Sequence, residues 1–272
     1  MSIAIIIPFF QRESGILRKS LDSVFKQSCD DDYHIFIVND DSPIKPEQDL
    51  QGFTTDQISK ITVLDRKNGG PGRARNTALD VIDSSIYEFI AFLDSDDIWE
   101  PFHLSKAIEA LSQGYDFYFS NFFQLDNTIS VFEKAESNKK FNVSDHKKIS
   151  GRDLYSYCGD FAAQIICGNL IGTPTVVFRS SVGAGIRFKR SFYYAGEDYL
   201  FWLDFASKTE KIVFSTHCTC RCERGINIYS SNGWGTPFAL ERIRDELKYL
   251  KLTEKLYPLT TQSDQIRKQK KG

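Results

Sequence analysis

The stretch 89-FIAFLDSDDIWEP-101 joins an apolar run to a cluster of carboxylates. Its first five residues have the length and composition of a buried β-strand, and Asp94, Asp96 and Asp97 follow directly. Carboxylates this close are costly to bury together unless a positive charge lies between them. The stretch therefore predicts either a solvated turn that caps a helix or a site for a divalent metal ion that carries phosphate groups.

Strands and helices are predicted to alternate along the first half of the chain. Short apolar runs predict strands over 3–7, 34–38, 61–64 and 88–93, and helical spacing of apolar residues predicts helices after the first, third and fourth strands. This alternation is typical of an α/β fold with a mostly parallel central sheet flanked by helices. Ligands bind beyond the carboxyl ends of the strands in such sheets, so we expect the loops there to form one site.

The second half of the chain has a less regular pattern. It predicts a hairpin formed by 116–124 and 129–133, then a mobile loop over 134–150. Later runs predict a strand that ends at 179, a helix after 197–198, a strand over 212–222 and an amphipathic helix over 238–256. These elements predict a smaller elaboration beside the first sheet rather than a second, separate domain.

Bulk properties exclude several classes of protein. The chain has 272 residues, of which 41% are apolar, and a net charge of −2, so it allows a sizeable core and predicts no nucleic-acid partner. No run of about 18 apolar residues predicts a membrane span. Residues 1–10 do not resemble a signal peptide, so we expect a cytoplasmic protein. The basic tail, residues 267–271, predicts either a solvated end or a peripheral contact with anionic lipid.

Three of the six cysteines, Cys218, Cys220 and Cys222, alternate along one predicted strand. This alternation would place their side chains on one face. A zinc site that also uses Cys158 and Cys167 is conceivable, but the spacing lacks the usual Cys-x-x-Cys pair. Free thiols, buried or half-buried, are the favoured interpretation.

Three further polar segments follow or precede regular elements. Asp40-Asp41-Ser42 predicts either an Asx-turn or an acceptor for a base N–H group. The segment 68-NGGPGRARN-76 predicts a helix start, and its glycines and Arg75 would also suit a phosphate group. Glu197-Asp198 predicts either a favourable charge at a helix N-terminus or, at Asp198, a general base.

In this order, the motifs resemble the inverting glycosyltransferases of family 2, which have the GT-A fold. The resemblance rests on Pro8 at a strand end, Asp40-Asp41-Ser42, GPGRARN, FLDSDDIWEP and Glu197-Asp198. It covers residues 3–125 strongly and reaches about residue 235 more loosely. The segments IPFFQRESGIL and RGINIY also resemble bacterial exopolysaccharide glycosyltransferases of the succinoglycan type.

The resemblance implies a nucleotide-sugar donor, with UDP as the nucleotide, and a divalent ion, Mn²⁺ or Mg²⁺. Pro8 and Phe9 would border the base, and Asp94 would lie near the ribose. The implied donor-site residues are Pro8, Phe9, Asp40, Asp41, Gly72, Arg75, Asp94 and Ser95, with Asp96 on the metal and Asp198 as the catalytic base. The implied acceptor is a saccharide or a lipid-linked oligosaccharide, and the transferred sugar is a hexose such as glucose.

The implied organisation has three parts. Residues 1–125 would bind the nucleotide-sugar, residues 126–235 would form the acceptor side with the catalytic base, and residues 236–272 would form a helix and a basic tail. The segments 134–150 and 224–236 would close over the substrates. Tyr229 or Trp234 would either stack on an acceptor sugar or pack in the core.

Three positions depart from the usual pattern of the family. Gln11 stands where Asn is common, Ser42 where Gly is common, and Glu223 where His is often found. Two alternatives from other classes remain. A nucleotidyltransferase would need a Gly-rich, Lys-bearing loop after the first strand, which residues 7–15 do not supply. A non-catalytic protein that binds a sugar nucleotide would not need Asp198.

Overall fold

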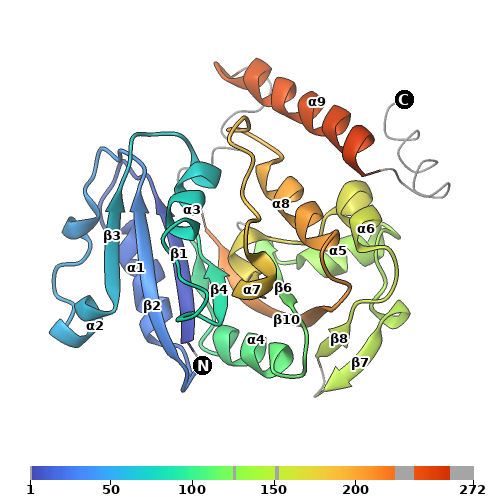
Figure 1. Cartoon of the computed structure of the whole chain (residues 1–272), viewed down its shortest axis with the longest axis horizontal. Helices are drawn as coiled ribbons and strands as arrows, with labels where there is room; N and C mark the ends of the chain where they lie inside the picture. Colours follow the sequence, from blue (N-terminus) through green and yellow to red (C-terminus); the bar gives the residue numbers. More distant parts are fainter. Residues whose placement is uncertain (1, 125–126, 151–152, 224–235, 258–272) are drawn as a thin grey trace.

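The central element of the computed structural model is a ten-stranded sheet with helices on both faces (Figure 1). The structure describes residues 2–124, 127–150, 153–223 and 236–257. Strand order along the sheet is β3-β2-β1-β4-β9-β6-β10-β8-β7, and β5 pairs separately with β10. No helix in these described ranges has both the length and the apolar character needed to cross a membrane.

The elements of the first half are β1 (Ser2–Phe9), α1 (Ile16–Phe25), β2 (Asp32–Asn39), α2 (Thr55–Ser59), β3 (Ile61–Asp65), α3 (Pro71–Leu79), β4 (Phe89–Phe92), β5 (Ile98–Trp99), α4 (His103–Leu111) and β6 (Phe117–Gln124). Those of the second half are α5 (Val131–Ser137), β7 (Lys147–Ser150), β8 (Leu154–Ser156), α6 (Phe161–Gly168), β9 (Val177–Arg179), α7 (Ser180–Gly183), α8 (Glu197–Ala206), β10 (Ile212–Cys222) and α9 (Ala239–Leu256). Single 3-10 turns cover Pro46–Gln48, Val143–Asp145 and Thr173–Thr175.

Parallel pairing dominates the half of the sheet that carries the donor motifs. β1 pairs in parallel with β2 and β4, and β2 pairs in parallel with β3. β9 runs antiparallel to β4 and β6, and β10 runs parallel to β6. The outer strands β8 and β7 are antiparallel. The predicted α/β class with a mostly parallel sheet is confirmed.

The sheet is covered on both faces, which explains the nearly continuous apolar strands. On β1, Ile3, Ile5 and Ile7 pack with residues of α1 and α4, whereas Ala4 and Ile6 pack with residues of α3 and α8. Burying each of these isoleucine side chains contributes about 1.5–3 kcal/mol. The strand ends are therefore held rigidly against two layers of helices.

Two predicted elements are wrong. Residues 129–133 do not form a strand of a hairpin, because α5 begins at Val131 and β6 pairs instead with β9 and β10. The reason is a capping box: Ser130 Oγ accepts from Glu133 N, and the Glu133 carboxylate accepts from Ser130 N at 2.8 Å. Residues 134–150 are likewise not one loop, since they contain the end of α5 and strand β7.

Two predicted boundaries shift by a short distance. The first strand continues through Pro8 to Phe9, because pairing with β4 ends at Ile6 and leaves a place for a residue without an N–H group. Pro101 suits the first turn of a helix, which predicts a helix start at that position, but α4 begins at His103, so Pro101 lies before its first turn. Neither shift moves the polar residues away from the carboxyl edge of the sheet.

Candidate active site

The loops after β1, β2 and β4 are joined by a small network of hydrogen bonds. Gln11 N donates to Ser42 Oγ at 2.9 Å, and Ser42 Oγ donates to Gln11 O at 3.0 Å. Gln11 Nε2 donates to Ser95 Oγ at 2.9 Å. Two of the three positions that depart from the family pattern, Gln11 and Ser42, thus bond to each other, and through Gln11 they connect to the acidic turn.

Asp40 is 3% exposed and holds the glycine-rich segment in place. Its carboxylate accepts from Gly69 N at 3.1 Å and from Gly70 N at 2.7 Å, and it also pairs with Arg66. Asp41 is exposed and has a left-handed backbone with φ of 60°. The two adjacent aspartates therefore differ: Asp40 fixes the loop, and Asp41 faces solvent.

Gly70 and Gly72 allow close approach of protein side chains. Gly70 has φ of 88°, and a Cβ added there would lie 2.9 Å from the ring of Tyr193. A Cβ added at Gly72 would lie 3.0 Å from Glu197 Cγ and 3.1 Å from Phe188 Cβ. The glycines at the start of α3 thus bring this helix against the segment that carries the acid pair.

Arg75 links the two acidic groups of the site. The side chain is 3% exposed and lies 5.9 and 5.3 Å from the ring centroids of Phe92 and Phe188. Its Nη2 donates to Asp94 Oδ1, while Nε and Nη1 have no hydrogen-bond partner among the described residues. A buried guanidinium with two unpaired nitrogens can bind an anionic ligand.

The acidic turn contains side chains in two different environments. Asp94 and Asp96 are partly exposed, whereas Ser95 and Asp97 are buried. Asp97 N donates to Asp94 O at 3.0 Å, which closes the turn. Burial, together with Cys222, Asp94 and Asp96, raises the pKa of Asp97 well above its usual value. Asp94 and Asp96 therefore offer the carboxylate oxygens that a hard divalent cation prefers, and the turn fits such an ion.

Glu197 and Asp198 form the first turn of α8, which follows Gly196 in a left-handed conformation. Burial and the neighbouring Asp198 raise the pKa of Glu197 to about 8. Burial also raises the pKa of Asp198, while hydrogen bonding from Tyr199 N and the charge of Arg75 oppose this rise. A carboxyl pair with a raised pKa is suited to accept a proton near neutral pH. The charge of Arg75, which pairs with Asp94 of the acidic turn, also acts to lower the pKa values of Glu197 and Asp198.

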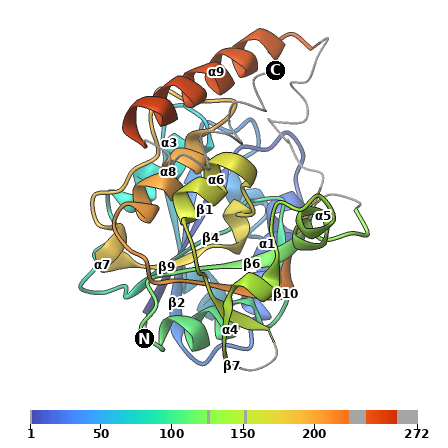
Figure 2. The same cartoon turned by 90° about the vertical axis from the view of Figure 1, so that its right-hand side faces the viewer.

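Helix α9 holds the segment before the acid pair. Figures 1 and 2 show it on the outer side of the molecule, away from the sheet and next to α8. Asp245 Oδ2, on a side chain with 1% exposure, accepts from Tyr193 N at 3.0 Å and Tyr194 N at 3.1 Å. A Cβ added at Gly196 would lie 3.1 Å from Tyr249 Cβ. The sequence predicted α9 as an amphipathic helix but gave no signal that Asp245 supports the site.

Arg66 and Tyr193 are further residues that sequence reasoning missed. Arg66 pairs with Asp40, and Tyr193 OH donates to Asn68 Oδ1 at 3.1 Å. Both contacts join segments far apart in sequence, so no local pattern indicates them. Pro8 and Phe9 are buried at the end of β1. The predicted acceptor residues Tyr229 and Trp234, and the basic tail, lie outside the described residues.

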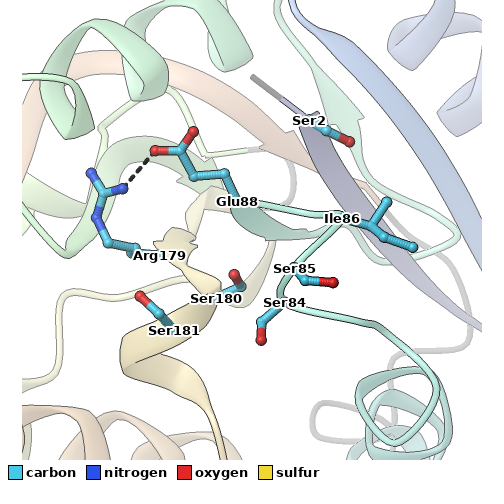
Figure 3. A pocket seen from close by; sticks show the side chains of 8 residues that line it. All are labelled: Ser2, Ser84, Ser85, Ile86, Glu88, Arg179, Ser180 and Ser181. Carbon is cyan, nitrogen blue, oxygen red and sulfur yellow. Dashed lines mark hydrogen bonds and ion pairs between the residues drawn. The ribbon is translucent and has the colours of Figure 1, made fainter.

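A hollow of about 600 Å³ lies at the opposite, amino-terminal edge of the sheet (Figure 3). Its lining residues are Ser2, Ser84, Ser85, Ile86, Glu88, Arg179, Ser180 and Ser181. The two charged side chains there, Arg179 and Glu88, already pair with each other at 2.7 Å. Because ligands of such sheets bind at the carboxyl edge, we do not assign the active site to this hollow.

The geometry of the carboxyl edge defines a class of protein. One acidic turn presents two partly exposed carboxylates, and one buried carboxyl pair has raised pKa values. On a mostly parallel sheet that ends in mixed pairing, these groups indicate a nucleotide-sugar transferase of the GT-A type. The model of "Glycosyl transferase family 2" matches residues 4–166, and the chain belongs to this family of glycosyltransferases.

The chain is also similar in sequence to individual proteins named for glycan synthesis. The succinoglycan biosynthesis protein ExoW of Rhizobium meliloti is 30% identical over 231 residues, which cover 84% of this chain and 71% of ExoW. The Escherichia coli enzyme WfgD, a UDP-Glc:alpha-D-GlcNAc-diphosphoundecaprenol beta-1,3-glucosyltransferase, is 29% identical over 202 residues, covering 74% of this chain and 68% of WfgD.

A solved structure supports the GT-A fold. The crystal structure of residues 1–349 of S. aureus TarS in complex with UDP-GlcNAc matches with a TM-score of 0.68. The match covers 98% of this chain and 70% of that chain, at 19% sequence identity. The predicted fold and the predicted family are both confirmed.

Proposed function

We propose that the protein is a metal-dependent, inverting glycosyltransferase that uses a UDP-sugar. It transfers a hexose, with glucose as the first candidate, to a saccharide or lipid-linked saccharide in surface or exopolysaccharide synthesis. The observation that carries this proposal is the Arg75 guanidinium, which pairs with Asp94 and acts on the charge of Glu197 and Asp198. Donor and acceptor chemistry would therefore occur on the two sides of one buried cation.

The choice of substrates is supported by the names of the similar proteins. ExoW is named for succinoglycan biosynthesis, and WfgD is named for transfer from UDP-Glc to a diphosphoundecaprenol-linked sugar. The TarS structure contains UDP-GlcNAc. A UDP-sugar donor is consistent with the names of WfgD and of the TarS complex, and a lipid-linked saccharide acceptor is consistent with the name of WfgD. Any contact of this chain with the inner face of a membrane would follow from such an acceptor.

Asp96 is the proposed metal ligand, and Asp94 is the proposed partner of the ribose. Both side chains are partly exposed at the carboxyl edge, where oxygen ligands are available to Mn²⁺ or Mg²⁺. When bound, such an ion neutralises the diphosphate and makes it a better leaving group. The Asp40-Asp41 turn, Pro8 and Phe9 would surround the uracil, with Gly72 and Ser95 shaping the same donor site.

Asp198 is the proposed catalytic base. It would remove the proton from the acceptor hydroxyl while the hydroxyl oxygen forms a bond to the anomeric carbon. The bond from that carbon to the phosphate oxygen breaks on the opposite face, and its electron pair leaves with UDP. One base is sufficient, because no covalent intermediate with the enzyme is formed and the configuration is inverted.

Calorimetric titration of UDP, with and without Mn²⁺, tests the donor site in wild type and Asp96→Ala. We expect binding to wild type that requires Mn²⁺, and about 10–100-fold weaker metal-dependent binding by the variant. Tight binding by Asp96→Ala in the presence of Mn²⁺ would remove Asp96 from the metal site. Binding of GDP or dTDP in place of UDP would change the proposed donor nucleotide but would still support the proposed glycosyltransferase function.

A further inference from the structure

A second group of metal-ligating side chains lies directly beside the acidic turn. One carboxylate oxygen of Asp97 and the Sγ atoms of Cys220 and Cys222 all lie within 4.8 Å of one another. Asp97 is 5% exposed, Cys220 is 1% exposed, and Cys222 is half-buried. Three ligand atoms are thus gathered in a largely buried place, next to the partly exposed Asp94 and Asp96.

The pairing of β5 with β10 brings these residues together. Cys220 stands opposite Trp99, and Arg221 stands opposite Ile98, the residue that follows Asp97. Glu223 N, at the end of β10, donates to Asp97 Oδ1 at 3.1 Å. The group therefore rests on backbone pairing, which holds its residues close without any ion.

Cys218 belongs to the same strand but not to this group. β10 has register irregularities against β6 between Ser215 and Cys218 and again between Cys218 and Cys220. These irregularities interrupt the simple alternation that would place all three cysteines on one face. The cluster therefore differs from the all-cysteine zinc set that the sequence made conceivable: it has two cysteines and a carboxylate that the sequence pattern did not indicate.

Two thiolates and one carboxylate are the donor set of a borderline cation such as Zn²⁺, whereas Mg²⁺ and Mn²⁺ prefer oxygen ligands. Zn–S bonds of about 2.3 Å and Zn–O bonds of about 2.1 Å require the ligand atoms to approach each other slightly more closely. Side-chain rotation of Cys222, which is half-buried, can supply this movement. Three protein ligands leave the fourth tetrahedral position for water.

We propose that Asp97, Cys220 and Cys222 form a binding site for a Zn²⁺-class cation, distinct from the ion assigned to Asp96. Binding forms one Zn–O bond and two Zn–S bonds, and the protons held by the two thiols and by the Asp97 carboxyl group are released to solvent. The bound ion ties the acidic turn to the end of β10. The proposal does not depend on the transferase function, since it concerns metal binding alone.

Titration of the reduced protein with Co²⁺, a spectroscopic substitute for Zn²⁺, tests this site. We expect near-ultraviolet sulfur-to-cobalt absorbance that saturates at one equivalent and disappears when Zn²⁺ is added, but not when Mg²⁺ is added. Cys220→Ser, Cys222→Ser and Asp97→Asn should each weaken Co²⁺ binding at least tenfold. Cys218→Ser, the matched control on the same strand, and Asp96→Ala should retain the absorbance of wild type.

Two results would overturn the proposal. One is the absence of sulfur-to-cobalt absorbance in wild type whose six thiols are shown to be reduced by a thiol assay. The other is absorbance that survives in both cysteine variants or is lost in Cys218→Ser. Circular dichroism identifies a variant that fails to fold, and the half-buried Cys222 position provides the second variant if the Cys220 change is not tolerated.

Discussion

The donor side and the base side of the site are held in different ways. On the donor side, loops that directly follow neighbouring strands bond to one another, as Gln11 does with Ser42 and Ser95. On the base side, the segment before Glu197 is held by Asp245 of α9, which is 52 residues from Tyr193 in the chain. The donor side is thus a product of the sheet, whereas the base side depends on a distant helix.

The largest expected effect is on the base side, from Asp198→Asn. The variant keeps the shape of the side chain but cannot take the hydroxyl proton, so the transfer rate should fall about 10²–10⁴-fold. Metal-dependent UDP binding should stay unchanged, because the donor loops are not altered. Product formation from UDP-glucose and calorimetry of UDP are the two measurements.

The control for this variant is Asp56→Asn, which changes an exposed acid on α2. It should leave both the rate and the binding at the level of wild type. A transfer rate close to wild type in Asp198→Asn would show that another group takes the proton. The segment with Glu197 and Asp198 would then not contain the catalytic base, although the structural difference between the two sides would remain.

A smaller effect is expected from Asp245→Ala, which removes the acceptor of two backbone N–H groups. Leaving buried N–H groups unpaired costs about 1–3 kcal/mol each, so the segment before α8 should move. We expect kcat to fall while the affinity for UDP and Mn²⁺ is retained. Steady-state kinetics, with calorimetry of UDP, separates these quantities.

Asp245→Asn and Lys251→Ala sharpen this test. The asparagine keeps one side-chain oxygen, so it should recover part of kcat. Lys251 is exposed on the same helix, and its removal should change nothing measurable. Equal loss of UDP affinity and kcat in Asp245→Ala would mean that α9 supports both sides of the site. The statement that only the base side depends on this helix would then be wrong.

The two sides also differ in how well the sequence predicts them. The strands, the acidic turn and the glycine-rich helix start were predicted, since apolar periodicity and turn residues act over a few positions. The roles of Asp40 and Asp245 were not, because a carboxylate that accepts from a remote backbone has no local signature. The predicted hairpin is wrong because the capping box of Ser130 and Glu133 starts a helix at apolar residues that also suit a strand.

The roles assigned to Pro8, Phe9, Asp40, Asp41, Gly72, Arg75, Asp94, Ser95, Asp96 and Asp198 are predictions, and the experiments above test those of Asp96 and Asp198. The structure gives the hydrogen bonds, ion pairs and burial of these residues, which the sequence does not. In particular, Asp40 is already engaged by Gly69, Gly70 and Arg66. Its effect on a nucleotide would therefore act partly through the loop that it holds.

A pH-dependent effect is expected from Glu197→Gln. The pKa of Glu197 is raised to about 8 in the folded state by burial and by Asp198, so the unfolded state binds fewer protons between its ordinary pKa and pH 8. The stability of wild type should therefore decrease as pH rises through this window. Glu197→Gln removes the titrating group, so its Tm advantage over wild type should grow from about pH 4.5 to pH 8.

Thermal melts of both proteins across this pH range measure the difference. A constant Tm gap would mean that Glu197 is not destabilised by burial beside Asp198. In that case the base side would lack the raised carboxyl pKa that distinguishes it from the hydrogen-bonded donor side. Asp56→Asn again provides the control, because an exposed acid should give a gap that does not grow over this range.

The smallest expected effect comes from Gly72→Ala, at the contact between the two sides. The added methyl group would lie 3.0 Å from Glu197 Cγ and 3.1 Å from Phe188 Cβ, so α8 or α3 must shift by a few tenths of an ångström. Overpacking of this kind costs about 1–3 kcal/mol of stability, and the displaced acid pair should lower kcat several-fold. Gly168→Ala is the matched control, because its added Cβ would meet its nearest neighbour at an ordinary 3.5 Å. If Gly72→Ala changed UDP affinity instead of kcat, the glycine would contribute directly to donor binding. The start of α3 would then belong to the donor side of the site and not to the contact between the two sides.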